Sequence, residues 1–270
     1  IQMKNISIIG GGPAALILAA HIDTTKYNVI IYDKKKAAGR KFLVAGEGGL
    51  NLTFNAPIDE LIKQYSPSKF MEPILRQFTN EDLRDWFKTI EIPTFLGSSN
   101  RVFPTKDLKP IDVLNKIANH LKEKGITFEF EKTWTGWNKD GDLTFEDKTE
   151  VKTDITVFAM GGASWKVTGS DGDWAKAFES KKIKIVPFKA ANCAFGVDWH
   201  KNFISTHAGK PLKNIELTYK RQKAKGELVI SKFGLEGNAI YAISEKIQKA
   251  IAKEETIEIK LDLKPTMTKS

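Results

Sequence analysis

The residues that most constrain the fold are 6–33, where an apolar strand-like run, a glycine turn, a helix-forming stretch and a second apolar run follow one another. The turn Gly-Gly-Gly-Pro-Ala-Ala begins at Gly10 and fits the pattern G-x-G-x-x-G/A. Gly10 allows a sharp turn, Gly12 lets a diphosphate approach the backbone, and the small Ala15 lets the helix pack close to the strand. Pro13 suits the start of a helix, whose free N–H groups and positive dipole end attract phosphate.

An acid ends the second apolar run. Asp33 lies 21 positions after Gly12, about where a carboxylate accepts a hydrogen bond from a ribose hydroxyl. Because strand, turn, helix, strand and acid all occur in the required order, the stretch predicts dinucleotide binding. The alternative is a tight turn in an α/β protein that binds nothing, which leaves the acid and the triple glycine unexplained. The motif by itself does not separate NAD from FAD.

Composition excludes several classes of protein. A chain of 270 residues with 41% hydrophobic residues forms one large or two medium domains. Its single cysteine, Cys193, rules out an internal disulfide and a CxxC redox pair, which favours a reducing, cytoplasmic compartment. The four histidines and the cysteine show no metal-ligand spacing, so no metal is expected. No catalytic triad can be read from them, and the catalytic residues stay unknown.

The formal net charge of +9 raises the question of an acidic partner. The lysines are spread along the chain, so a solvated basic surface with a site for an anionic cofactor is favoured over nucleic-acid binding. No apolar run approaches the ~20 residues of a membrane span, and no membrane partner is expected. The sequence thus predicts a small-molecule substrate, and no feature indicates an oligomeric state.

Residues 39–53 form a basic, glycine-rich segment that includes Gly48 and Gly49. Such a composition predicts backbone wrapped closely around an anion or a flat ring. Arg40 can bind a phosphate through two N–H groups, and Lys41 supplies a point charge. The alternative is a flexible surface loop, but the apolar residues 42–44 favour burial.

The middle of the chain is predicted as alternating helices and strands. Residues 58–87 read as helical, with Asn80 as an N-cap, and a hairpin is expected within 92–103, followed by a helix over 110–124. Four short runs predict a β-meander that returns to a buried strand: 126–131, 133–137, 143–146 and 154–158.

The glycine pair after the last of these strands puts bare backbone at the carboxyl edge of the sheet, where ligands bind in such folds. Asp171 and Asp173 precede a predicted helix over 174–180, for which plain capping is an equal alternative. From residue 190 the pattern changes to strands at 193–197, 215–219, 227–230 and 257–263, with a helix over 239–253. We therefore expect a first domain of residues 1–189 and a β-rich second domain of residues 190–270.

Together with the glycine turn, four further motifs resemble a family of bacterial flavoproteins, the aminoacetone-oxidase-like or NAD(P)/FAD-dependent oxidoreductases. The motifs are GRKFLVAGEGGLNLT (39–53), RVFPTK (101–106), FAMGGASWKVTGSDGDWA (158–175) and GELVISKFGLEGNAIYAIS (226–244). The resemblance implies FAD as the bound dinucleotide. It also implies an α/β fold in which a glutathione-reductase-like Rossmann FAD domain with a β-meander is interrupted by an inserted, mostly-β domain.

The resemblance also assigns cofactor-binding residues. The pyrophosphate is carried by Gly10, Gly12, Pro13, Ala14 and Ala15. Asp33 holds the adenosine ribose with Lys34 beside it, and the segment along the phosphates and flavin includes Arg40, Lys41, Gly48, Gly49 and Asn51.

Later segments complete this implied site. Trp134 occupies the meander position whose backbone contacts adenine, and the adenosine is flanked by Ala159, Met160 and Gly161. Ser164 and Asp171 fall on the flavin side.

Two departures from the family pattern matter. Many members have Arg-Cys where this chain has Gly49-Leu50, so it is similar to the branch that reads GLNLT. Members normally return from the inserted domain to the FAD domain, whereas this chain stops at Ser270. The sequence is therefore expected to be C-terminally truncated, with an incomplete FAD domain.

The favoured function is that of an FAD-dependent oxidoreductase, whose flavin exchanges hydride with transiently bound NAD(P)H and a small-molecule substrate. The chain has no second GxGxxG that would hold a nicotinamide donor permanently. One alternative is an NAD-dependent dehydrogenase, which shares residues 10–33 but does not predict the basic glycine-rich segment. Another is a non-enzymatic or nucleic-acid-associated flavoprotein, which needs a basic, aromatic-lined face.

Overall fold

The chain consists of two units. The computed structural model describes residues 3–44, 49–97 and 100–267. Contacts divide the chain into Ile1–Val186 and Pro187–Ser270, and each unit has a hydrophobic core of its own. The boundary expected from the sequence, between residues 189 and 190, falls close to this division.

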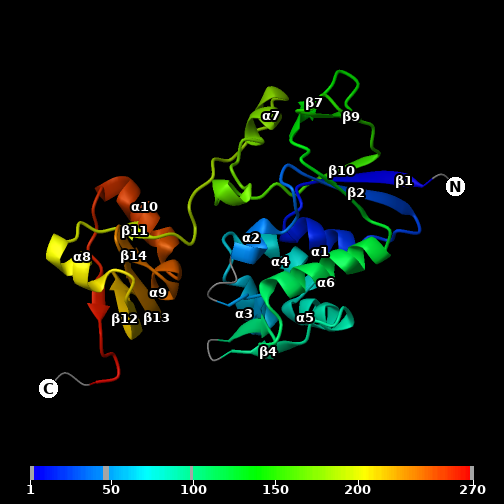
Figure 1. Cartoon of the computed structure of the whole chain (residues 1–270). Coiled ribbons are helices and arrows are strands. Elements are labelled where there is room, and N and C mark those ends of the chain that lie inside the picture. The colour runs from blue at the N-terminus through cyan, green and yellow to red at the C-terminus, as the bar shows by residue number, and fades with distance from the viewer. Residues whose placement is uncertain (1–2, 45–48, 98–99, 268–270) are drawn as a thin grey trace. The chain divides into compact units, whose positions relative to one another are not determined.

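A parallel sheet with the strand order β10-β1-β2-β6 organises the first unit (Figure 1). Its strands are β1 (Lys4–Ile9), β2 (Tyr27–Asp33), β6 (Thr127–Phe130) and β10 (Ile155–Phe158). Parallel neighbours cannot be joined by a tight turn, so a crossover helix is needed between β1 and β2. Helix α1 (Pro13–His21) supplies it. The prediction of a Rossmann-type α/β unit with a parallel sheet is confirmed.

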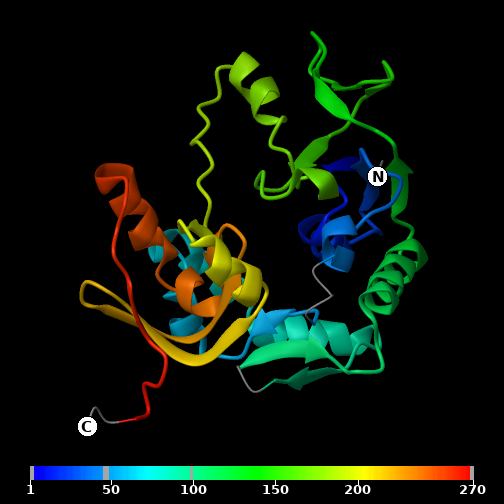
Figure 2. The ribbon, with the colours of Figure 1, turned by 60° about the vertical axis from the view of Figure 1, so that its left-hand side comes forward.

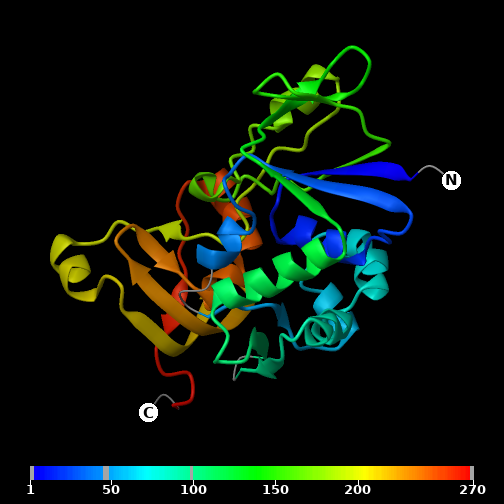
Figure 3. The same cartoon turned by 45° about the vertical axis from the view of Figure 1, so that its right-hand side comes forward.

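The two faces of this sheet are covered differently. Ile8 and Ile31 lie in a core with residues of α1 and of α6 (Pro110–Glu123). Ile9 and Tyr32, one position along each strand, join a second cluster with aromatic residues of the β-meander. Successive side chains of a strand point to opposite faces, which explains the division. Figure 3 shows β1 and β2 between the helices on one side and the green meander on the other.

The meander differs from its prediction in two ways. It contains β7 (Trp134–Trp137), β8 (Leu143–Phe145) and β9 (Glu150–Val151), whereas β6 pairs with β2 in the parallel sheet. The strand β10 is not fully buried as expected, and Ile155 is 40% exposed. The reason is its position, because β10 is an outer strand of the sheet among the described residues.

A small antiparallel sheet in the order β3-β5-β4 and several helices complete the first unit. Their bounds are α2 (Arg40–Val44), β3 (Thr53–Phe54), α3 (Ile58–Ile62), α4 (Ser68–Gln77), α5 (Asn80–Thr89), β4 (Thr94–Leu96), β5 (Arg101–Pro104), the 3₁₀ turn η2 (Lys166–Thr168) and α7 (Ala175–Ser180). The N-cap of α5 is Thr79, not Asn80 as predicted. Thr79 and Asp82 form a reciprocal capping box, which satisfies two backbone N–H groups at once.

The second unit is an antiparallel sheet in the order β11-β14-β13-β12-β15, and Figure 2 shows β12 and β13 as its long curved hairpin. Its elements are β11 (Phe195–Gly196), α8 (Lys201–His207), β12 (Pro211–Tyr219), β13 (Gln222–Ser231), β14 (Gly234–Glu236), α9 (Asn238–Tyr241), α10 (Ser244–Glu254) and β15 (Lys260–Asp262). The single helix predicted over 239–253 is two helices, and α8 was not predicted. The Ser244 hydroxyl donates to the Tyr241 carbonyl (2.9 Å) at the break between α9 and α10.

Candidate functional site

A cavity of about 960 Å³ lies in the first unit, lined by residues from the glycine turn, α2, the meander and the loop after β10. Binding sites for cofactors are commonly clefts of ~300–1,000 Å³. The loops after β1, β2 and β10 all contribute, because the carboxyl ends of parallel strands meet at one edge of the sheet. The cavity is therefore where this fold places a ligand.

The glycine turn is tight at one position and open at another. Gly10 has φ +102°, and a Cβ atom there would lie 2.5 Å from the Ala159 carbonyl oxygen. Gly12 has extended backbone and is the N-cap of α1. A Cβ atom on Gly12 would have no other atom within 4 Å. Gly10 thus lets β1 approach the loop after β10, whereas Gly12 leaves free space at the N-terminus of a helix, as a diphosphate requires.

Backbone N–H groups hold the Asp33 carboxylate beside this turn. Oδ2 accepts from the Gly11 N–H (2.6 Å), and Oδ1 accepts from the Lys35 N–H (2.7 Å). Each carboxylate oxygen can accept a further hydrogen bond. Asp33 also lines the cavity, and its carboxylate keeps capacity to accept a hydrogen bond there.

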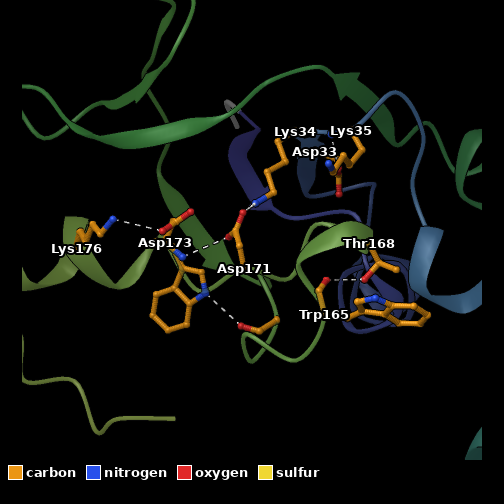
Figure 4. A network of polar contacts seen from close by, with 10 residues as sticks. Asp33, Lys34, Lys35, Trp165, Thr168, Asp171, Asp173 and Lys176 are labelled. Carbon is orange, nitrogen blue, oxygen red and sulfur yellow. Dashed lines mark hydrogen bonds and ion pairs between the residues drawn. The ribbon is translucent and has the colours of Figure 1, made fainter. Parts of the chain in front are cut away.

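An ion pair joins the end of β2 to the loop after β10. Lys34 Nζ lies 2.5 Å from Asp171 Oδ2, and the two side chains are 30% and 18% exposed (Figure 4). Burial raises the pKa of the Asp171 carboxyl, but the hydrogen bonds from Lys34 and the Asp173 N–H outweigh it, so the net pKa is lowered. Asp171 is therefore a carboxylate near neutral pH.

Two buried polar atoms beside the cavity have no hydrogen-bond partner among the described residues, the Ser170 hydroxyl and the Trp134 indole N–H. Both residues are among those that line the cavity. Ser170 Oγ would lie 2.6 Å from a Cβ atom on Gly161, whose φ is +79°. The carbonyl of Gly161 accepts from Trp174 Nε1 (3.1 Å). The loop after β10 is thus closely packed yet leaves hydrogen-bonding capacity unused at the ligand site.

Residues 40–44 of the basic segment form a short helix, α2, which was not predicted. Residues 45–48, where the predicted wrapped loop continues, lie outside the described residues. Phe42 and Leu43 pack against the main core, and that burial favours a helical turn. Lys41 Nζ donates to the Ser164 hydroxyl, which ties α2 to the loop after β10. Arg40 and Lys41 both line the cavity, so α2 brings two cations to it.

The structure brings most of the predicted cofactor-binding residues to this cavity. Those that line it are Gly10, Gly12, Pro13, Ala14, Asp33, Lys34, Arg40, Lys41, Asn51, Trp134, Ala159, Met160, Gly161 and Asp171.

Four predicted residues are placed otherwise. Ala15 is fully buried in α1 and not part of the lining. A Cβ atom on Gly49 would meet the Phe103 ring at 3.2 Å, outside the lining. Ser164 is not part of the lining, and its hydroxyl accepts from Lys41, which is. Gly48 lies outside the described residues.

Other lining residues were missed by sequence reasoning, among them Lys35, Lys132, Thr133 and Trp174. Lys132 and Thr133 precede β7, so the predicted meander could have located them. Trp174 follows the acids at the start of α7, and nothing in its local pattern indicates a ligand site.

Over the part of the chain that the structure describes, no helix has the length and apolar character needed to cross a membrane.

Comparison with known proteins gives relatives of the chain. It is 24% identical over 279 aligned positions to the 3-dehydro-bile acid delta(4,6)-reductase of Clostridium scindens (strain ATCC 35704 / DSM 5676 / VPI 13733 / 19), an alignment that covers 99% of this chain and 66% of that protein. The chain thus spans slightly less than two thirds of that relative's length.

Solved structures with some likeness include the open conformation of a flavocytochrome c3 fumarate reductase (15% identity, 79% of this chain and 47% of that chain, TM-score 0.47). Another is Thermovibrio ammonificans THI4 (12% identity, 62% of this chain and 61% of that chain, TM-score 0.39). Residues 4–252 match the family model described as "HI0933-like protein Rossmann domain". Because this match spans most of both units, the chain belongs to the HI0933-like family.

Proposed function

We propose that the protein is an FAD-dependent oxidoreductase. The observation that carries the proposal is that one cavity joins Gly12, Asp33 and the cations of α2. These residues offer a diphosphate site, a ribose acceptor and positive charge in one continuous space. A cavity of about 960 Å³ suits an extended dinucleotide.

The residues present fit FAD. Gly12 leaves room for the pyrophosphate at the N-terminus of α1, and Asp33 has accepting capacity left for the adenosine ribose. Arg40 and Lys41 lie where they can balance negative charge on the phosphates or on a reduced flavin. Bound flavin would supply the hydride chemistry, and the protein would supply position and electrostatics.

Further aspects of the proposal follow from the motifs. The proposal includes membership of the aminoacetone-oxidase-like group and of its GLNLT branch. It also includes a glutathione-reductase-like arrangement and the insertion of the second unit into the FAD domain. We propose NAD(P)H as a transient electron donor, since the chain has one GxGxxG motif. The relative from Clostridium scindens is named as a reductase, which supports a reductive role for this chain. The single cysteine supports a cytoplasmic location.

The test is cofactor content followed by reduction. Purified protein should be yellow, or become so with FAD, and the bound flavin should be bleached by NADH or NADPH under anaerobic conditions. A panel of electron acceptors would then identify the substrate class. Colourless protein that binds no added FAD, but is protected against heat by NADH, would instead establish the dehydrogenase alternative.

A further inference from the structure

The Lys34–Asp171 ion pair spans the position of β1 at the carboxyl edge of the sheet. In the strand order β10-β1-β2, Lys34 follows β2 and Asp171 belongs to the loop after β10. The glycine turn follows β1, between these two loops. The pair therefore connects the loops on either side of the turn, 137 residues apart in sequence.

The loop that carries Asp171 is closed upon itself. Trp165 and Ser170 exchange two backbone hydrogen bonds, each 3.2 Å long, and the Thr168 hydroxyl donates to the Trp165 carbonyl (2.9 Å). Gly169, with φ +100°, lies against the lysine stems, since a Cβ atom there would be 3.4 Å from Lys35 Cε and 3.6 Å from Lys34 Cε. These bonds brace residues 165–170 against one another, and the ion pair with Lys34 holds Asp171 at the end of this loop.

We propose that Lys34 and Asp171 form a clasp that closes across the glycine turn and retains the adenosine half of the bound dinucleotide. The proposal rests on the proposed function, since it assumes FAD in this cavity. It places Asp171 on the adenosine side, next to Lys34, and not on the flavin side that the family resemblance implies. Lys34 and Asp171 act as positioning residues, because their charges pair with each other and hold the loop in place. Entry and release of the dinucleotide require this pair to open.

The electrostatics of the pair suit such a role. Both side chains are largely shielded from water, which strengthens their attraction relative to a surface pair. Loss of one partner leaves the other charge uncompensated in a partly buried site. The neighbouring carboxylates do not replace Asp171, because Asp173 pairs with Lys176 (3.4 Å) and Asp33 is held by backbone N–H groups.

The test measures release of FAD, by the rise in flavin fluorescence after dilution, from wild type and four variants. Lys34→Gln and Asp171→Asn each remove one charge of the ion pair. The double variant that combines Lys34→Asp with Asp171→Lys exchanges the two charges. Lys116→Gln is the matched control, because Lys116 pairs with Glu91 (3.0 Å) away from the cavity lining. Binding of ADP and of FMN, measured by calorimetry, separates the two halves of the dinucleotide.

Each single variant is expected to release FAD at least about tenfold faster, the size typical of one charge-assisted hydrogen bond. The reversed pair should restore slow release, the control should match wild type, and ADP but not FMN should bind more weakly to the single variants. Unchanged release in the single variants would overturn the clasp. So would a reversed pair as defective as Asp171→Asn, because it would mean that Asp171 contacts the ligand directly. Wild type that binds neither FAD nor ADP would contradict the proposed function itself.

Discussion

The backbone N–H of Gly11 donates to the carboxylate of Asp33 across 2.6 Å. This bond joins the glycine turn after β1 to the acid at the end of β2. The two halves of the dinucleotide motif are therefore in direct contact, and the orientation of the acid does not depend on a ligand.

Asp33→Asn should lower both stability and dinucleotide affinity. An amide has one accepting oxygen, so its NH₂ group would face one of two backbone N–H donors. We expect a loss of about 1–3 kcal/mol in the free energy of unfolding, measured by urea denaturation, and weaker ADP binding by calorimetry. Asp154→Asn is the control, since Asp154 accepts from the Asn5 N–H (2.7 Å) outside the cavity lining. If both variants bound ADP as wild type does, Asp33 would have no role in binding.

Substitution of alanine at two positions of the turn should separate folding from binding. Gly10→Ala combines a positive φ with a Cβ atom 2.5 Å from the Ala159 oxygen, so it should cost about 2–4 kcal/mol of stability. Gly12→Ala meets no protein atom and should change stability by less than about 1 kcal/mol.

The same Gly12→Ala methyl group would occupy space needed by a diphosphate, so FAD affinity should fall at least about tenfold. For Gly10→Ala, the control is Gly141→Ala, which tests backbone strain alone because Gly141 has φ +90° and no atom within 4 Å of its Cβ position. Thermal unfolding and FAD titration measure the two effects. Tight FAD binding by Gly12→Ala would contradict the proposed position of the pyrophosphate.

Ser170→Ala should stabilise the ligand-free protein. The Ser170 hydroxyl is buried without a hydrogen-bond partner among the described residues, and such a group costs about 1–3 kcal/mol. Removal of the oxygen should therefore raise the melting temperature. Ser180→Ala is the comparison, because Ser180 Oγ donates to the Ala177 carbonyl (2.7 Å) on the surface. A lower melting temperature for Ser170→Ala would show that the hydroxyl has a partner in solution.

Stability should fall as the pH drops below about 6.5 because of His120. Burial, followed by the charges of Lys124 and His21, lowers the pKa of His120 from its ordinary 6.5. The unfolded chain then binds a proton at a higher pH than the folded protein does. Stability is therefore complete above pH 6.5 and decreases as the pH falls from there through the lowered pKa.

His120→Gln should flatten this part of the pH profile of the melting temperature. The ring of His120 packs against Trp86 (centroids 6.4 Å apart), which also contacts His21. The variant will be somewhat less stable at pH 8, so the slope between pH 5 and 7, rather than the absolute value, is the readout. An unchanged slope would assign the titration to another group.

Local patterns predicted the β1–α1–β2 unit and its glycine turn because these depend on neighbours in sequence. The periodicity of residues 110–124 gave α6 almost to its ends. The predictions of local structure and burial failed where contacts between residues distant in sequence determine the conformation. The helical form of α2 depends on burial of Phe42 and Leu43 against other elements, and the exposure of Ile155 depends on which strand lies at the edge.

The same distinction applies to the site. Gly10 and Gly12 could be assigned from spacing, because the motif itself encodes their roles. The pairing of Lys34 with Asp171 could not, since nothing in either local pattern specifies a partner 137 residues away. A contact between side chains that meet across the sheet edge can be identified only from the folded structure.

The two backbone hydrogen bonds to the Asp33 carboxylate also have an evolutionary consequence. Its second donor is the main chain of position 35, and a backbone N–H is retained through every substitution except proline. The orientation of the acid is therefore robust to sequence drift at that position. The clasp, built from two side chains, is lost with a single substitution at either end. Natural variation in cofactor retention should therefore accumulate at positions 34 and 171 while the binding pose stays fixed.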